Sequence, residues 1–523
     1  MKLHDPTPGG VADVSSIGID PSCSNRKILI ALVGLGALTA TFYFEWWLRA
    51  PVGRLAFIAL PLTLFYHTVQ IFIPWMLFLN ARRAPAPPPE RGLSVDVFVV
   101  AYNEPAWLVK KTLKAAVKMR YPHRTYLLDD GRRNELASAA KTLGAVYITR
   151  SNNKHAKAGN INHALEKTDG EIIVIFDTDH TPKPEFLERS VGHFRDSRVG
   201  FVQVMETFSN ADESFISRAA TETTDEFFGP ICIGMDSWDS CTLFGTNALI
   251  RRAALEQIGG YKPGLTEDLA TSIELHAAGW GSRYVHEPLA PGLSPADLRG
   301  FFVQQFKWAL GVFGLLFTVY PRRVFKLTWR QRFCYLTRMT CYLAGPYCAA
   351  HILLAFFLLF GSGATHSVFL GYALRYLPLF ALILIIQTYS VHHWSRDTAR
   401  LRWRAISLVY STWPVYVAAL FCALFRWKVD YLPTPKVFQR GNYLPLAAPQ
   451  FFATTSLVIG LTYLMNASGF TQATFAVEGF ACLLVLANAS LAVGVFEGLQ
   501  SRPMKRLGQP AFTSQVSVSP RIR

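Results

Sequence analysis

The sequence has few charged residues and no paired cysteines. Asp, Glu, Lys and Arg make up only 17% of its 523 residues, whereas 51% are hydrophobic, and this balance excludes a disordered or fibrous protein. The eight cysteines stand singly, with no CxxC pair, so the sequence predicts neither a zinc site nor a disulfide framework. We expect reduced thiols that are mostly buried.

Acidic residues are scarce relative to basic ones. The 52 Lys and Arg outnumber the 36 Asp and Glu, and the net charge of +16 is compatible with nucleic acid, an anionic membrane surface or a phosphorylated substrate. No module that combines basic and aromatic residues accompanies this charge, so nucleic acid is not an expected partner. Much of the positive charge lies instead beside long apolar runs, which indicates a lipid bilayer.

Long apolar runs flank a more polar middle of the chain. Two precede it and four follow it, at about 28–48, 55–80, 336–361, 368–392, 450–468 and 474–497. Each is close to the roughly 20 residues that a helix needs to cross a bilayer, so the sequence predicts about six transmembrane helices. A further run, 403–425, contains Ser, Thr and Pro and has a basic flank, which favours an amphipathic helix at the membrane interface.

Basic residues near the ends of these runs predict their orientation. Arg26 and Lys27 precede the first run, other Lys and Arg residues follow the second and precede the third, and the connection at about 362–367 has none. Because Lys and Arg concentrate on the cytoplasmic side of a membrane, we expect the polar middle and both termini to be cytoplasmic.

Short β-rich runs alternate with amphipathic stretches of helix length between 94 and 180. The expected strands are 94–102, 124–130, 145–150 and 171–179, and the expected helices are about 106–119, 134–143 and 157–168. This alternation predicts an α/β fold with a doubly wound, mostly parallel sheet. Ligands bind outside the carboxyl ends of the strands of such a sheet.

Polar and acidic residues stand at the predicted strand ends. They are Tyr102 and Glu104 after the first strand, Asp129 and Asp130 after the second, and Asp177 and Asp179 after the fourth. Clustered carboxylates repel one another, and Asp177-Thr178-Asp179 offers oxygen ligands suited to Mg²⁺ or Mn²⁺ shared with substrate phosphates. The first strand is followed by Tyr-Asn-Glu-Pro instead of a glycine-rich turn, which disfavours a dinucleotide-dependent oxidoreductase.

Five motifs occur in a fixed order: LLDDG (127–131), HAKAGN (155–160), FDTDH (176–180), TED (266–268) and QQFKW (304–308). With them, the chain resembles membrane-embedded, processive glycosyltransferases of family 2, such as bacterial cellulose synthase catalytic subunits and curdlan-type β-glucan synthases, from about 94 to 440. The resemblance implies an A-type glycosyltransferase domain inserted between transmembrane helices. It also implies a multi-pass protein of the bacterial inner (cytoplasmic) membrane.

The resemblance implies a division of the chain into eight segments. They are a flexible cytoplasmic N-terminus (1–27), two transmembrane helices (28–83), the cytoplasmic glycosyltransferase domain (84–298), interface helices (299–335), two transmembrane helices (336–392), an interface helix with a gating loop (393–449), two transmembrane helices (450–497) and a basic cytoplasmic tail (498–523). Arg502 and Arg506 in the tail have the spacing of half a cyclic-di-GMP motif, but the other half is not found, so we interpret them as juxtamembrane charge.

The resemblance also implies residues for binding a UDP-sugar donor. They are Tyr102, Glu104, Asp129 and Asp130 around the uridine, and Lys157, Asp177, Gln304, Lys307, Thr434 and Lys436 around the diphosphate. Asp177 and Asp179 would hold Mg²⁺ or Mn²⁺ against the diphosphate. Thr434 and Lys436 belong to YLPTPK (431–436), which resembles the gating loop of the family.

The catalytic motif implied by the resemblance is Thr266-Glu267-Asp268. Asp268 would be the general base that takes a proton from the acceptor hydroxyl, in a transfer that inverts the anomeric carbon and expels UDP. The same three residues also suit the start of a helix, with Thr266 as N-cap and acidic residues in the first turn. Both interpretations are compatible.

The acceptor would be bound by Trp308 and by the loop Phe244-Gly245-Thr246-Asn247, whose first residue is usually Cys in cellulose synthases. Trp308 ends a motif, usually QxxRW, in which this chain has Lys307 for Arg. Lysine keeps the charge but loses the bidentate fork. Residues 299–320 also fit an amphipathic interface helix with an anchoring Trp.

These features predict a synthase that adds glucose from UDP-glucose to a β-glucan with β-1,3, β-1,4 or mixed linkage and passes the polymer across the membrane. Its expected partners are UDP-glucose, the glucan chain, the lipid bilayer and periplasmic export proteins. One alternative is a non-processive transferase that glycosylates a lipid carrier. Another is a transporter or scaffold with a degenerate nucleotide domain.

Overall fold

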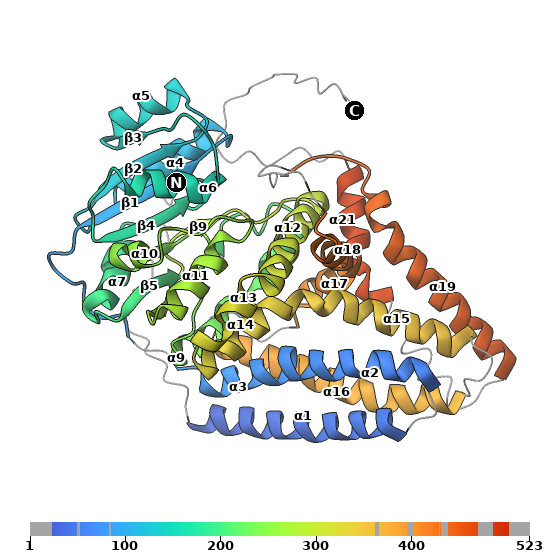
Figure 1. Cartoon of the computed structure of the whole chain (residues 1–523). Helices are drawn as coiled ribbons and strands as arrows, with labels where there is room; N and C mark the ends of the chain where they lie inside the picture. The colour runs from blue at the N-terminus through green and yellow to red at the C-terminus, as the bar shows by residue number, and fades with distance from the viewer. Residues whose placement is uncertain are drawn as a thin grey trace, which may run out of the picture.

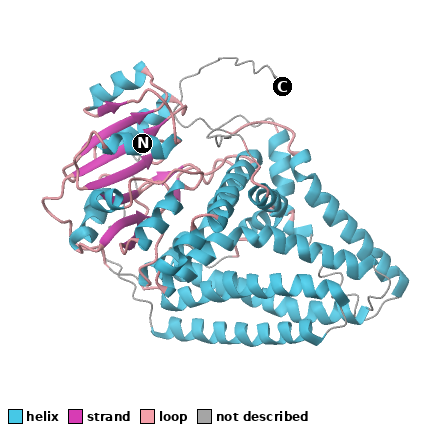
Figure 2. Cartoon of the chain, viewed as in Figure 1, coloured by secondary structure: helices cyan, strands magenta, loops and turns pink. Residues whose placement is uncertain are grey.

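The computed structural model describes residues 23–49, 53–82, 85–360, 366–394, 401–427, 429, 438–468 and 485–500. An α/β domain with a central sheet lies at one end of the molecule, and long helices run away from it (Figure 1). In Figure 2 the strands are confined to that domain. The two parts correspond to the polar middle and to the apolar runs of the sequence.

Seven strands form the central sheet, in the order β3-β2-β1-β4-β7-β5-β8. They are β1 (Val95–Ala101), β2 (Arg124–Asp129), β3 (Val146–Ile148), β4 (Ile172–Asp177), β5 (Val199–Val204), β7 (Ala248–Arg251) and β8 (Gly281–Val285). Only β7 runs antiparallel to its neighbours, β4 and β5. The sheet is therefore mixed but mostly parallel, as predicted.

Helices cover both faces of this sheet. They include α4 (Ala106–Val117), α5 (Asn134–Leu143), α6 (Ala156–Leu165), α7 (Phe186–Ser190), α10 (Arg252–Gln257) and α11 (Glu267–Ala277). Alternate residues of β1 belong to different cores, with Val97 and Val99 packed on one face and Phe98 and Val100 on the other. A strand buried on both faces has to be apolar throughout, which is why residues 97–101 are an unbroken apolar run.

The four predicted strands and three predicted helices of residues 94–180 are all present. The helix expected at 134–143 is α5, with the same ends, and the strand expected at 145–150 is the shorter β3. A second, two-stranded sheet of β6 (Thr207–Phe208) and β9 (Pro291–Gly292) was not predicted.

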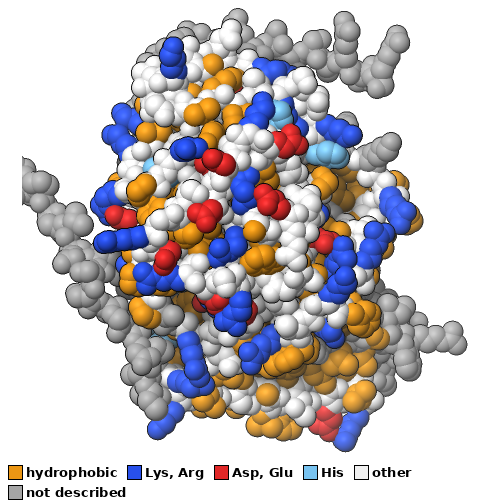
Figure 3. Space-filling model, turned by 60° about the vertical axis from the view of Figure 1, so that its left-hand side comes forward, with side chains coloured by type: hydrophobic (Ala, Val, Ile, Leu, Met, Phe, Trp, Pro, Cys, Tyr) orange, Lys and Arg blue, Asp and Glu red, His pale blue; other side chains and the backbone are white. Residues whose placement is uncertain are grey.

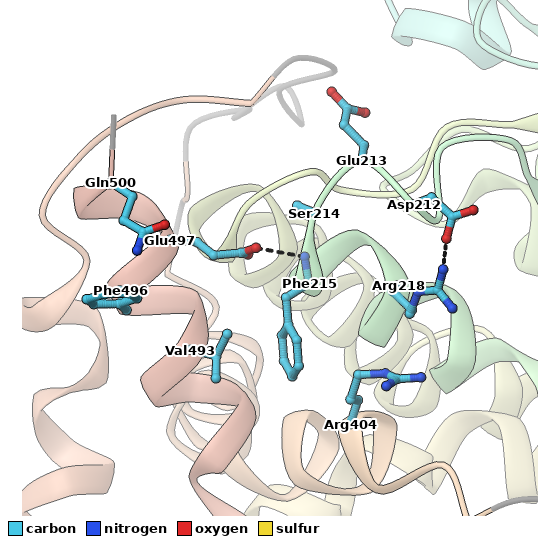
Figure 4. A pocket seen from close by; sticks show the side chains of 10 residues that line it. All are labelled: Asp212, Glu213, Ser214, Phe215, Arg218, Arg404, Val493, Phe496, Glu497 and Gln500. Atoms are coloured by element: carbon cyan, nitrogen blue, oxygen red, sulfur yellow. Dashed lines mark hydrogen bonds and ion pairs between the residues drawn. The ribbon is translucent and has the colours of Figure 1, made fainter. Parts of the chain in front are cut away.

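The segment between β6 and β7 leads from the α/β domain towards the long helices. It contains α8 (Phe215–Glu226), a π-helical turn (Phe227–Ile231) and α9 (Cys232–Ser237). The far end of the described chain, α21 (Ala489–Leu499), packs on α8, and Glu497 accepts a hydrogen bond from the backbone N–H of Phe215 at 2.9 Å (Figure 4).

The predicted transmembrane runs form long helices. They are α1 (Cys23–Arg49), α2 with a π-helical turn and α3 (Gly53–His67, Thr68–Phe72, Ile73–Asn80), α15 (Ala344–Phe360), α16 (His366–Trp394) and α19 (Leu444–Ser468). α1, α2 and α16 lie side by side (Figure 1), and α1 leaves Leu35, Leu38 and Phe42 exposed. In Figure 3 charged side chains are spread over the α/β domain and hydrophobic ones gather at the lower edge. Such a surface suits lipid.

Five described helices are long and apolar enough to cross a membrane: Arg26–Arg49, Leu60–Asn80, Leu298–Phe317, Leu374–Trp394 and Leu444–Tyr463. The third is α12 (Leu298–Phe317), which the sequence analysis placed at the interface; in Figure 1 it lies between the α/β domain and α18.

The run at 403–425 is a bent pair, α17 (Trp403–Ser411) and α18 (Trp413–Leu424), with an angle of 41° between them. Residues 469–484 lie outside the described residues, so the last predicted run is seen only in part. The count of about six spans and the segment boundaries stay predictions.

Candidate active site

Lys157 connects three of the predicted motifs. It lies in the first turn of α6, and its Nζ donates a hydrogen bond to Oδ1 of Asp177 at 2.5 Å and to the carbonyl oxygen of Gly245 at 2.7 Å. Asp177 is the last residue of β4, and its backbone N–H donates to Oγ1 of Thr246 at 3.0 Å. The motifs at 155–160, 176–180 and 244–247 are thus held together by one lysine and one hydroxyl.

Asp268 faces this lysine across Gly245. A Cβ atom placed on Gly245 would lie 3.5 Å from Oδ2 of Asp268 and 3.5 Å from Nζ of Lys157, and the φ of +88° also favours glycine. α11 begins at Glu267 with Thr266 as N-cap, as predicted, although the Thr266 side chain makes no capping hydrogen bond. The sequence therefore brings Asp268 to the edge of the sheet where Asp177 ends β4.

The carboxylates at this position are partly buried and hold protons more tightly than usual. Burial raises the pKa of Glu267 from 4.5 to about 7, and the nearby charge of Asp268 adds to the effect. Burial also raises the pKa of Asp268, against the opposing charges of Lys157 and Arg338. A carboxylate with a raised pKa is a stronger base, which is the property that a general base needs.

Two residues of this cluster were not assigned a role from the sequence. The ligand atoms of His180, Asp177 and Asp179 all lie within 4.8 Å of one another. Both ring nitrogens of His180 are buried without a hydrogen-bond partner, and its Nδ1 is 3.6 Å from Asp179. Burial raises the pKa of Glu206 to about 7, and the charges of Asp177 and Asp268 contribute.

A signal for both residues was available in the sequence. His180 directly follows the Asp-Thr-Asp triplet, and Glu206 comes two residues after the end of β5. The rule that ligands bind at the carboxyl ends of strands applies to β5 as it does to β4. Two carboxylates and an imidazole with unpaired ring nitrogens form a donor set that fits a divalent cation.

Asp129 and Asp130, at the end of β2, are bound by arginines. Asp129 is fully buried and accepts hydrogen bonds from the side chain and backbone of Arg133 and, at 3.0 Å, from the hydroxyl of Tyr147. Asp130 accepts two from Arg150, at 2.7 and 2.6 Å. Neither arginine was predicted as a partner. A contact of these aspartates with uridine stays a prediction.

Tyr102 and Glu104 lie beside this pair. The carboxylate of Glu104 accepts a hydrogen bond from the backbone N–H of Tyr102 at 2.7 Å, and the carbonyl oxygen of Glu104 accepts one from Arg133 at 2.5 Å. Tyr102 itself is exposed, with 45% of its surface accessible. An exposed ring beside a fixed backbone could stack on a base, and this role also stays a prediction.

The predicted acceptor loop, residues 244–247, is held in place by hydrogen bonds to the side chain of Gln203. The side chain of Gln203 accepts a hydrogen bond from the backbone N–H of Phe244 at 2.9 Å and donates one to the carbonyl oxygen of Thr246 at 2.8 Å. Asn247 donates to the carbonyl oxygen of Ala290 at 3.1 Å. Gln203 is buried in β5, and no motif in the sequence marked it.

α12 brings the QQFKW motif against the start of α11. Gln304, Lys307, Trp308 and Gly311 share one face of the helix because they are three, four and seven residues apart. A Cβ atom at Gly311 would lie 2.6 Å from Cγ2 of Thr266, so the two helices touch there. Trp308 is 38% exposed one turn away. The predicted Thr434 and Lys436 lie outside the described residues.

Comparisons with known proteins show which proteins this chain is similar to. Residues 91–311 match the family described as "Glycosyltransferase like family 2". Cellulose synthase 1 of Komagataeibacter xylinus is 35% identical over 347 residues, covering 62% of this chain and 22% of the relative. The UDP-forming cellulose synthase catalytic subunit of Pseudomonas fluorescens is 34% identical over 341 residues, covering 61% and 46%. The matched part spans less than half the length of these relatives.

Among solved structures, the mannosyltransferase PcManGT from Pyrobaculum calidifontis, in complex with GDP-Man and Mn²⁺, aligns with a TM-score of 0.49 and 19% identity, covering 72% of this chain and 100% of that one. The family match and the mixed sheet agree with the predicted A-type glycosyltransferase fold. Residues 91–311 therefore match the model of glycosyltransferase family 2, and the chain is similar to cellulose synthases across and beyond that domain.

Proposed function

We propose that this protein is a processive, inverting synthase that transfers glucose from UDP-glucose to a growing β-glucan and passes the polymer through its own transmembrane helices. The observation that carries the proposal is the position of Asp268. It lies partly buried at the start of α11, beside Gly245 and Lys157, and the QQFKW helix packs against Thr266, two residues before it. The UDP-forming activity named for the relatives supports the choice of donor.

In this proposal Asp268 removes the proton from the acceptor hydroxyl as that oxygen attacks the anomeric carbon. Its raised pKa favours proton uptake. Lys157, which already pairs with Asp177, contributes positive charge at the phosphates of the donor. Trp308, exposed on α12 beside α11, provides a flat apolar surface for the terminal sugar of the acceptor.

Asp177, Asp179 and His180 are the residues that would hold a divalent cation, Mg²⁺ or Mn²⁺. Their two carboxylates and the unpaired ring nitrogens of His180 fit such an ion. When bound, the cation supplies charge stabilisation for the departing diphosphate.

Export of the polymer is supported by a cavity among the long helices. It has a volume of ≈320 Å³ and is lined by α2 and its π-helical turn, α8, α15, α16 and α17. Polar residues of the predicted spans, His67 and Gln70, line it, together with tyrosines such as Tyr66 and Tyr347, whose rings stack with centroids 4.4 Å apart. Tyrosine rings with hydroxyls suit a sugar chain, because they offer apolar faces and hydrogen bonds.

The proposed location is the bacterial inner membrane, with the glycosyltransferase domain in the cytoplasm where UDP-glucose is available. The basic residues beside the apolar runs support this orientation. The glucan, the bilayer and periplasmic export proteins would then be its partners.

The test is to supply the purified full chain in lipid vesicles with labelled UDP-glucose and Mg²⁺ or Mn²⁺. We expect an insoluble polymer that linkage-specific β-glucanases digest, together with release of UDP. A single glucose in the lipid extract would instead show a non-processive transferase. Absence of any glucose transfer would contradict the donor assignment and favour a scaffold.

A further inference from the structure

Residues 320–333 form a surface between α12 and the following helix that is both basic and aromatic, and it is called the basic turn below. It consists of α13 (Tyr320–Arg323), a 3-10 turn (Val324–Lys326) and the first turn of α14 (Trp329–Thr340). Five Lys and Arg residues lie in it, whereas no Asp or Glu occurs anywhere between 298 and 396. The neighbouring sequence therefore supplies no carboxylate to balance this charge.

Three of the five basic residues are not used inside the protein. Arg323 donates a hydrogen bond to Glu274 of α11 at 2.8 Å, and Arg332 donates to two backbone carbonyl oxygens of the basic turn, at 3.0 and 3.2 Å. The other three are exposed, and no carboxylate of the described residues forms an ion pair with them: Arg322, Lys326 and Arg330. Their charge is available to an anion outside the chain.

Exposed aromatic rings lie among these charges. Phe325 is 84% exposed, Trp329 54% and Phe333 43%. The rings of Trp329 and Phe333 are 6.0 Å apart, and the guanidinium of Arg332 lies 5.8 Å from the ring of Phe325, which connects that ring to α14. Neighbouring apolar side chains that remain exposed on a folded surface indicate a contact with a partner or a membrane.

The position of the basic turn indicates a membrane. α14 packs against α12, α3 and the π-helical turn before α3, and in Figure 1 α13 and α14 lie between the α/β domain and the helices α2 and α3. α3 is the half of the second predicted span that leads into the α/β domain. In the proposed orientation the basic turn therefore lies where the bilayer meets the cytoplasm, the level at which Trp, Lys and Arg gather in membrane proteins.

We propose that the basic turn is a binding site for the headgroups of anionic phospholipids in the cytoplasmic leaflet. Arg322, Lys326 and Arg330 pair with the lipid phosphates, and the rings of Phe325 and Trp329 enter between the headgroups. A free phosphate would use the charges but leave the rings in water, so a lipid fits the surface better. The proposal goes beyond the proposed function, because it assigns a lipid ligand and not a substrate.

The experiment measures lipid binding by the purified full chain in a neutral detergent and does not depend on glucose transfer. Dioctanoyl phosphatidylglycerol, dioctanoyl phosphatidylcholine and inorganic phosphate are titrated separately by calorimetry. We expect phosphatidylglycerol to bind at least about tenfold more tightly than the other two, with an affinity that falls as salt is added. Combining Arg322→Gln, Lys326→Gln and Arg330→Gln should weaken its binding by about tenfold or more, because each basic residue near the anionic headgroups contributes.

The matched control combines Lys111→Gln, Lys114→Gln and Lys118→Gln, which removes the same charge from an exposed face of α4 in the α/β domain. It should bind phosphatidylglycerol as the wild type does. A wild type that binds phosphatidylcholine or inorganic phosphate as tightly as phosphatidylglycerol would overturn the proposal without any variant.

Two further results would also overturn it. One is an unchanged affinity for phosphatidylglycerol when the charges of the basic turn are removed, or an equal loss in the α4 control. The other is a dimer of the lipid-free chain that Phe325→Ser dissociates, since the exposed rings would then belong to an interface with a second copy of this chain. Phosphatidylglycerol binding that weakens only in the basic-turn variant supports the proposal.

Discussion

Two groups of carboxylates at the same edge of the sheet are neutralised in different ways. Asp129 and Asp130 each have an arginine of their own and accept several hydrogen bonds. Asp177, Glu267 and Asp268 gather around one lysine. Loss of contact with water raises the pKa of both Glu267 and Asp268, and the charge of Asp268 raises that of Glu267 further. The first group has the properties of a rigid binding surface, because its carboxylates are held in place by hydrogen bonds. The second has the properties of a site that binds a cation and accepts a proton.

The largest effect that follows from this difference is on cation dependence. Removing divalent cations with a chelator should reduce glucose transfer to background, because Asp177 of the second group and the adjacent Asp179 then lack the positive charge of the cation. Mg²⁺ or Mn²⁺ should restore it, and transfer assays with and without added metal check the prediction. Full activity in excess chelator would show that the second group does not need a divalent cation.

The first group should matter more for stability. Arg150→Gln leaves Asp130 buried without its bidentate partner, so we expect a loss of about 3 kcal/mol or more in the free energy of unfolding, measured by denaturation in detergent. Adding Asp130→Asn should recover much of it. Arg124→Gln, whose partner Asp169 is exposed, is the control and should change little. Equal stability of Arg150→Gln and wild type would contradict the structural role given to the first group.

The contact between α12 and α11 tests how tightly Asp268 has to be placed. Gly311→Val inserts atoms where Thr266 lies, and we expect transfer to fall about tenfold, as for an overpacked core. Gly314→Val changes the same helix at a position with nothing within 4 Å of a new Cβ, so it should have a much smaller effect. Similar activities of the two variants would show that the helix contact does not position the site.

The smallest expected effect is a dependence of glucose transfer on pH, which arises from the carboxylates of the second group. Because Asp268 acts when ionised and burial raises its pKa, transfer should decline as the pH falls, at a higher pH than an ordinary Asp would cause. Stability should change in the opposite direction. A raised folded-state pKa means that Glu267 binds protons more tightly when folded, so stability falls as pH rises from 4.5 to about 7.

A pH–rate profile of wild type and Glu267→Gln checks this prediction. Removing the neighbouring carboxylate should move the acid limb of the profile to lower pH. A wild-type profile that is flat between pH 5 and 8 would contradict the raised pKa.

Local pattern in the sequence predicted the parallel half of the sheet. The strands and helices between 94 and 180 were predicted correctly because buried parallel strands are continuously apolar and alternate with amphipathic helices. β7 was not predicted, since Ala248–Arg251 is only four residues long and its antiparallel pairing with β4 and β5 is decided by tertiary contacts. The π-helical turn at Phe227–Ile231 was not predicted either, although it contains Gly229 and Pro230, which interrupt a regular helix.

The candidate site was predictable where a motif ends a strand or starts a helix. Asp177 was predicted from its place at a strand end and Asp268 from the family resemblance, and in the structure both lie beside Lys157. Arg150 was missed because its partner Asp130 lies 20 residues away, so only the folded chain brings them together. Sequence spacing carries no information on such pairs.

The most direct test of the proposed division is Asp268→Asn, measured for UDP binding and for glucose transfer in the same preparation. We predict that transfer falls by about a hundredfold or more, because the general base is lost, while UDP affinity and folding are preserved. Unchanged polymer output would contradict the account, and so would a loss of UDP binding that parallels the loss of transfer.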